Sequence, residues 1–160
     1  MARTFPQTAH SGLQKSLQNE WTYIQRVVEG TGDFFPPLEE ALANGFLPAL
    51  FGEPVLADDY RRPLAALPVK FAGLALPDPT ATATANYQAS TLVCSHLIQA
   101  LKPGSDTTFS QADHSATRAD CISEMKDRKL ILNEAELTRI TEPLDADLKR
   151  TLLRGKKCGQ

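Results

Sequence analysis

Two neighbouring carboxylates, Asp58 and Asp59, are the first residues in this sequence whose pairing suggests catalysis. Adjacent acids on a tight turn between two apolar strands can hold the metal ions of phosphoryl transfer. That arrangement needs an apolar strand on each side, whereas Pro54 precedes the pair and Tyr-Arg-Arg-Pro follows it at residues 60–63. We therefore interpret the pair as a solvated acidic loop beside two arginines, and we expect no metal site there.

Asp113, His114 and Ser115 supply the three side-chain types of a hydrolytic triad, but they are consecutive in the sequence. Consecutive side chains on a helix or strand point in different directions, so they cannot form the proton relay. We expect Asp113 or Ser115 to cap the following helix instead. A hydrolase is therefore only a third alternative for this chain.

Thiol and imidazole side chains that could bind a metal come from Cys94, His96, His114 and Cys121. Their spacing, two residues in the first pair and seven in the second, matches no common structural zinc pattern. Side chains two residues apart diverge by about 200° around a helix, so Cys94 and His96 cannot share one ion. We expect no metal and no other cofactor, and we interpret His96 as part of a buried helix face.

Positive charge gathers near the carboxy-terminal end, where no acidic residue follows Asp147. Such a cluster can contact a phosphate backbone, although charged tails are more often simply solvated. Basic residues from the middle of the chain are candidates to join it. The predicted phosphate-contacting residues are Lys149, Arg150, Arg154, Lys156, Lys157, Lys70, Arg61 and Arg62.

The composition favours a helical globular protein. The chain has 160 residues, of which 42% are hydrophobic and only 7% aromatic, and its formal net charge is −2. A chain of this length can bury a core without disulfides or metal, and its charge excludes a general polyanion-binding field. The three cysteines are an odd, sparse set, which indicates reduced thiols inside the cell, in the nucleus or cytoplasm. No apolar stretch is long enough for a signal peptide or a membrane span.

Apolar periodicity predicts the helices that would position these residues. One helical face between residues 12 and 29 is predicted by the recurrence of Leu13, Leu17, Trp21, Ile24 and Val28. A second helix is expected from residue 36, with a bend at Gly45 and Pro48 before a short second piece. Further helices are expected over residues 80–101, 110–133 and 141–154, the first stopped by Pro103 and Gly104 and the second broken before Leu130.

Between residues 52 and 79, frequent prolines predict an extended segment with at most a short edge strand over residues 67–76. The predicted fold class is therefore mostly α, a small helical domain with one proline-rich extended segment. The expected organisation is a flexible N-terminus over residues 1–11, a helical domain over residues 12–133, and a C-terminal helix with a basic tail over residues 134–160.

Several phrases, taken in order, resemble the carboxy-terminal part of reverse-transcriptase-like proteins from non-LTR retrotransposons, especially those of protists and algae. They are Leu-Gln-Lys-Ser-Leu-Gln-Asn-Glu-Trp at 13–21, Phe-Leu-Pro-Ala-Leu-Phe-Gly at 46–52, Leu-Pro-Val-Lys-Phe-Ala-Gly-Leu-Ala-Leu-Pro-Asp-Pro at 67–79 and Asp-His-Ser at 113–115. Ala72 and Ala75 stand in the third phrase where relatives often have glycine. The resemblance covers residues 12–118.

The resemblance implies a helical thumb-like or post-thumb segment that helps to hold a primer–template duplex. It transfers no catalytic residue, because the fingers and palm of such enzymes, which carry the catalytic carboxylates, have no counterpart in this sequence. We therefore expect a non-catalytic helical fragment with at most weak backbone binding to an RNA–DNA or DNA duplex. Trp21, Phe34 and Phe35 are expected to face the missing polymerase domains. The alternative is a helical protein–protein interaction module that uses the Leu13–Val28 face.

Overall fold

The computed structural model describes residues 2–54, 60–104 and 108–157, and within these ranges it contains helices and no strand. The predicted mostly α class is therefore confirmed. In the labels used here, α marks an α-helix and η marks a short π-helical or 3-10 segment. The elements are α1 (Pro6–Gly12), η1 (Leu13–Leu17), α2 (Gln18–Val27), η2 (Thr31–Phe34), α3 (Pro36–Ala41), η3 (Leu42–Phe46), α4 (Leu47–Phe51), α5 (Arg61–Ala66), η4 (Val69–Phe71), α6 (Pro79–Val93), α7 (Ser95–Leu101), α8 (Gln111–Thr141) and α9 (Ala146–Lys157).

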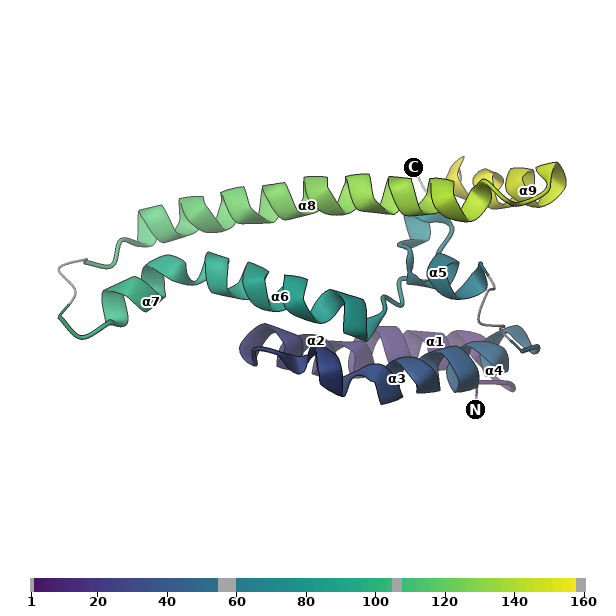
Figure 1. Cartoon of the computed structure of the whole chain (residues 1–160), viewed down its shortest axis with the longest axis horizontal. Helices are drawn as coiled ribbons and strands as arrows, with labels where there is room; N and C mark the ends of the chain where they lie inside the picture. Colours follow the sequence, from purple (N-terminus) through teal and green to yellow (C-terminus); the bar gives the residue numbers. More distant parts are fainter. Residues whose placement is uncertain (1, 55–59, 105–107, 158–160) are drawn as a thin grey trace.

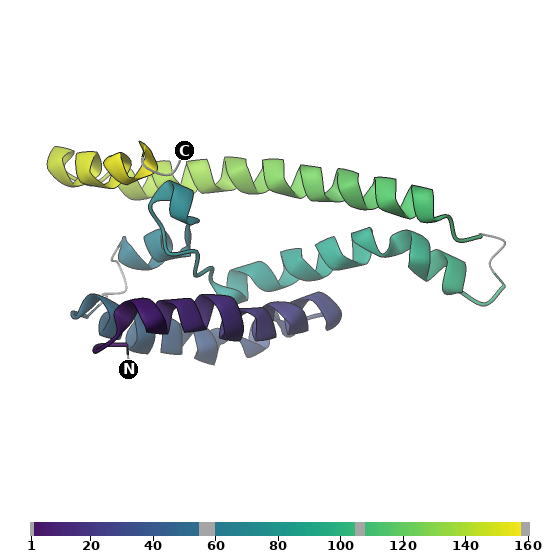
Figure 2. The ribbon, with the colours of Figure 1, turned by 180° about the vertical axis from the view of Figure 1, so that it is seen from behind.

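The N-terminal third forms two helices that lie side by side and run in opposite directions (Figures 1 and 2). The first is α1, η1 and α2 in one continuous run, and the second is α3, η3 and α4. The start of α6 packs against α2 and η2 and completes this bundle. Its buried core consists of Leu13, Trp21, Phe35, Leu42, Leu47, Ala65, Leu76 and Ala83.

Both helices of this pair differ from the prediction at specific points. The first begins at Pro6, inside the segment that we expected to be flexible, because proline suits a first helical turn and His10 Nε2 donates to the Leu74 carbonyl at 2.9 Å. The second helix does not bend at Gly45 and Pro48. It continues through the π-helical segment η3, which contains Gly45, and Pro48 follows in the first turn of α4.

The proline-rich segment contains a helix and a compact loop, and its described residues form no strand. Helix α5 occupies residues that we expected to be extended. Residues 67–76 fold into a loop in which Ala75 N donates to Leu67 O at 2.8 Å and Leu76 N to Ala65 O at 3.0 Å. Ala72 and Ala75 both adopt the left-handed conformation there, with φ of 64° and 54°. The expected edge strand cannot form because these two residues turn the chain.

Helices α6 and α7 run antiparallel to α8 and form with it a two-helix arm that extends beyond the bundle (Figures 1 and 2). The expected helix over residues 80–101 is present, although Cys94 interrupts it, and it ends before Pro103 as predicted. Helix α8 is unbroken over 31 residues, so no break precedes Leu130, and the expected domain boundary at residues 133–134 falls inside it.

A second, smaller core joins the end of α8 to the loop after α5. It consists of Leu67, Phe71, Leu137 and Ile140, with Tyr60 and Leu64 packed against it. Helix α9 then turns back and packs against η4. The loop that follows α5 therefore positions both the end of α8 and the basic helix α9.

Candidate interaction surfaces

The structure brings one of the central basic residues close to the basic helix. Lys70 is exposed on η4, against which α9 packs. Helix α9 carries Lys149, Arg150 and Arg154, whose side chains the structure describes. Lys156 and Lys157 belong to the same helix, but their side chains lie outside the described residues. Four predicted phosphate-contacting residues therefore gather at one end of the molecule.

Arg62 is not available for phosphate contact in the way that these four residues are, because its guanidinium is hydrogen-bonded to groups of this chain. Its Nε and Nη2 donate to the two carboxylate oxygens of Glu39, each at 2.5 Å, and its Nη1 donates to the Leu76 carbonyl at 2.9 Å. The Arg62 side chain is only 14% exposed. A two-pronged contact of this kind fixes α5 against α3, and Arg62 would have to abandon it to reach a phosphate.

Arg61 and Arg150, the latter one of these four, form ion pairs at the surface. Arg61 Nη1 lies 2.5 Å from Glu53 Oε1, and Arg150 Nη1 lies 3.3 Å from Asp147 Oδ1. Exposed ion pairs contribute little to stability, so a phosphate can compete for the arginine in each of them. The arrangement nevertheless lowers the free positive charge that α9 and its surroundings offer to a nucleic acid.

The predicted Leu13–Val28 face is divided in the structure. Leu13 and Trp21 are buried in the core, whereas Leu17, Ile24 and Val28 are exposed. The π-helical segment η1 causes this division, because its wider turn advances the register by one residue. The buried face therefore continues from Trp21 to Gln25. Trp21 and Phe35, which we expected to face missing domains, contact this chain's own core instead, while Phe34 is exposed.

Gln25 is a buried polar residue that the sequence analysis did not single out. Its side chain is completely buried, its Nε2 donates to Pro79 O at 2.7 Å, and its Oε1 accepts from Asn86 Nδ2 at 2.7 Å. Both ends of the amide are thus satisfied between α2 and α6. Its spacing of four residues from Trp21 is the signal that could have placed it on the buried face.

Exposed apolar side chains lie along α2, at both of its ends and on η2, and we call this set the α2 surface. The last turns of α2 contribute most of it, and η2, which packs against α2, contributes an aromatic ring that is 79% exposed. Its members are Leu17, Tyr23, Ile24, Val27, Val28 and Phe34. Several exposed apolar side chains on one helix are typical of an interaction site.

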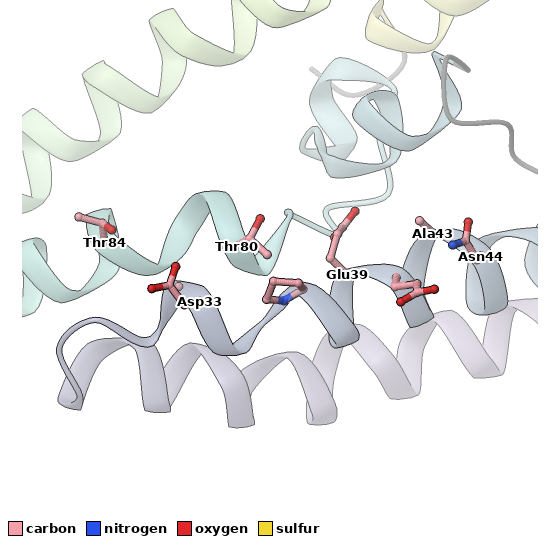
Figure 3. Close-up of a pocket in the computed structure, with 9 residues that line it drawn as sticks. Asp33, Glu39, Ala43, Asn44, Thr80 and Thr84 are labelled. Atoms are coloured by element: carbon pink, nitrogen blue, oxygen red, sulfur yellow. The ribbon is translucent and has the colours of Figure 1, made fainter.

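An acidic hollow lies between α3 and the start of α6 (Figure 3). Asp33, Glu39 and Glu40 line it together with polar side chains that include Thr80 and Thr84. The Glu39 carboxylate is already bound by Arg62. In the described part of the chain, no three histidine, cysteine or acidic side chains are grouped so that they could hold a metal ion.

The other candidate sites from the sequence are placed as follows. Asp113, His114 and Ser115 lie in the first turns of α8, and the helix is capped by Ser110, whose Oγ accepts from Asp113 N at 3.3 Å. The prediction that Asp113 or Ser115 is the cap is therefore wrong, because the helix begins at Gln111 and both residues already lie inside it. Asp58 and Asp59 lie outside the described residues.

Comparisons with protein-family models, with curated proteins and with solved structures return no match to this chain. None of the helices in the described ranges is both long enough and apolar enough to cross a membrane.

Proposed function

We propose that this chain acts by docking onto another polypeptide through the α2 surface, and that it has no catalytic activity of its own. The observation that carries the proposal is the exposure of Leu17, Ile24 and Val28 on a helix whose opposite side is buried in the core. A helix with a buried stripe normally presents polar residues to water, so a second apolar stripe calls for a second partner.

The resemblance to reverse-transcriptase-like proteins supplies the class of partner. In such a protein the α2 surface would contact the fingers and palm. The conformation of Ala72 and Ala75 supports this relationship, because relatives often have glycine at both positions and both residues are left-handed here. The partner that we propose is thus the polymerase part of a retroelement protein.

A binding measurement with that partner tests the proposal. The purified fingers-and-palm polypeptide of a non-LTR reverse-transcriptase-like protein is titrated with this chain by calorimetry. The variant Ile24→Glu/Val28→Glu should weaken binding at least about tenfold, because it places charge in a desolvated contact. The matched control Phe51→Glu/Leu153→Glu alters two apolar residues that are also exposed but lie outside the α2 surface. Absence of binding, or equal loss in both variants, would reject the proposal.

A second function, weak contact with a nucleic-acid backbone, is favoured by the position of Lys70 beside α9. The net charge of −2 opposes it, so the affinity should be low and strongly dependent on salt. Titration of a short RNA–DNA duplex in a salt series measures this dependence, with Lys149→Glu/Arg154→Glu as the test variant and Lys15→Glu/Arg26→Glu as the control of equal charge. With template, primer, magnesium and nucleotides, the chain alone should incorporate no nucleotide.

A further inference from the structure

Helix α9 packs onto the molecule with one side and presents positive charge on the other. Leu148 and Leu152, which are four residues apart, are half-buried on this helix, which packs against η4. Arg150, Leu153 and Arg154 are exposed. Leu153 and Arg154 follow Arg150 by three and four residues, so the three side chains share one side of the helix. The free side of α9 therefore combines arginines with an apolar residue.

The charge of this part of the chain is strongly positive. None of residues 148–160 is acidic, whereas residues 149, 150, 154, 156 and 157 are lysine or arginine. Exposed Lys70 on η4 borders the helix and adds to this charge. Salt screens exposed charges beyond about 10 Å, so this local excess, and not the net charge of −2, determines what the surface attracts. An anionic partner is therefore indicated.

The side chains beside the cations favour a lipid bilayer over a nucleic acid. Leu153 is 38% exposed and Val69, on η4, is 64% exposed. Apolar groups among cations gain from contact with acyl chains, whereas a phosphate backbone offers them nothing. Helix α9 and η4 contain no asparagine or glutamine, and their one aromatic ring, Phe71, is buried. They thus offer no exposed ring for a base to stack on and no amide to read its edge.

We propose that α9 and η4 bind peripherally to a bilayer that contains anionic lipids. Arg150, Arg154 and Lys70 contact the lipid headgroups, and Leu153 and Val69 enter the boundary between headgroups and acyl chains. Helix α9 lies at the edge of the molecule, away from the paired N-terminal helices, where a flat surface can approach it (Figures 1 and 2). This inference goes beyond the proposed function, because the α2 surface stays free for a polypeptide partner.

Sedimentation of the full chain with lipid vesicles tests the proposal. Phosphatidylcholine vesicles with about 30% phosphatidylserine should bind the chain, and vesicles of phosphatidylcholine alone should not. Added salt should weaken the binding, because it screens exposed charges. Arg150→Glu/Arg154→Glu should bind at least about tenfold more weakly. Arg150→Lys/Arg154→Lys should bind like the wild type, because the attraction depends on charge and not on the shape of the guanidinium.

The variant Leu153→Ser distinguishes a bilayer from a nucleic acid. It should weaken vesicle binding about threefold, because an inserted apolar group is lost, and should leave binding to an RNA–DNA duplex unchanged. The control Lys15→Glu/Arg26→Glu reverses two exposed bases far from α9 in the sequence and should keep vesicle binding, while circular dichroism verifies that each variant is folded.

Three results would overturn the proposal. The first is a chain that does not sediment with the anionic vesicles, or that binds both kinds of vesicle equally. The second is undiminished vesicle binding by Arg150→Glu/Arg154→Glu, which would place the contact elsewhere. The third is a chain that binds the duplex but no vesicle, which would assign the basic residues to nucleic acid alone. None of these results bears on the α2 surface, whose own test uses a polypeptide partner.

Discussion

Gln25 on α2 and Asn86 on α6 share a hydrogen bond of 2.7 Å inside the helix interface, from Asn86 Nδ2 to Gln25 Oε1. The same glutamine donates to Pro79 O, so both ends of a completely buried amide are satisfied. Because hydrogen bonds are directional, this pair of contacts fixes the register of α2 against the first turns of α6. The base of the arm is thereby attached to the N-terminal bundle at one defined position.

Replacement Gln25→Leu should lower the free energy of unfolding by about 2 to 3 kcal/mol, because the Pro79 carbonyl and the Asn86 amide both lose a buried partner. The measurement is the midpoint of urea denaturation followed by circular dichroism. Gln88→Leu, at an exposed position on α6, is the matched control and should shift the midpoint little. Equal midpoints for Gln25→Leu and the wild type would show that the two bonds contribute nothing.

Arg62→Lys tests whether the contact between α5 and α3 depends on the two-pronged geometry. Lysine keeps the charge but cannot bind both oxygens of Glu39 and the Leu76 carbonyl together, so we expect a loss of about 2 kcal/mol. Arg139→Lys, in the exposed pair with Glu136, should leave thermal stability almost unchanged. If Arg62→Lys is as stable as the wild type, charge alone holds α5 in place.

The helical class and several boundaries could be predicted from the sequence. Proline at residue 36 and the pair Pro103 and Gly104 act through local backbone geometry, so their effects do not depend on the rest of the fold. The extent of α8 could not be predicted, because few of its side chains are buried and its apolar pattern is correspondingly weak.

The candidate site was harder to predict than the fold, because it depends on register. A single π-helical segment moves Leu17 from the buried face to the surface and brings Gln25 into the core. Periodicity counted at 3.6 residues per turn cannot detect that shift. The position of Lys70 beside α9 depends on contacts between segments far apart in the sequence, which local patterns do not contain.

The pair formed by Glu136 and Arg139 predicts a dependence of stability on pH. Hydrogen bonds of 2.6 and 2.9 Å from the Arg139 guanidinium hold the pKa of the Glu136 carboxyl below its ordinary value of 4.5. A lowered pKa in the folded state contributes stability above the ordinary value, and that contribution is lost as the pH falls through the folded-state pKa.

Glu136→Gln should therefore lower the melting temperature slightly at neutral pH, and the difference from the wild type should disappear in acid. Thermal melts across the acidic range measure the effect. Glu134→Gln, at an exposed position on the same helix, serves as the control. A difference that stays constant from neutral to acidic pH would mean that the ionised carboxylate is not the source of the effect.

Gly73 is required by close packing. A Cβ at this position would lie 2.0 Å from Leu67 O and 2.6 Å from Leu64 O, and neither backbone oxygen can move without displacing the loop. Gly73→Ala should therefore cost more than about 3 kcal/mol or prevent folding. Gly12→Ala is the control, since its Cβ would meet nothing within 4 Å and alanine favours the helix. A stable Gly73→Ala protein would show that the loop has a different conformation in solution.

Ala72 and Ala75 predict the opposite effect in the same loop. Their positive φ angles strain a residue that carries a Cβ, and glycine relieves that strain while it increases the entropy of the unfolded chain. The balance predicts that Ala72→Gly and Ala75→Gly each raise the free energy of unfolding by up to about 1 kcal/mol. Ala66→Gly, inside α5, should lower it by a similar amount because glycine disfavours helix. If Ala72→Gly and Ala75→Gly instead destabilise the protein as Ala66→Gly does, the left-handed conformation is absent, and the structural support for the retroelement resemblance is lost with it.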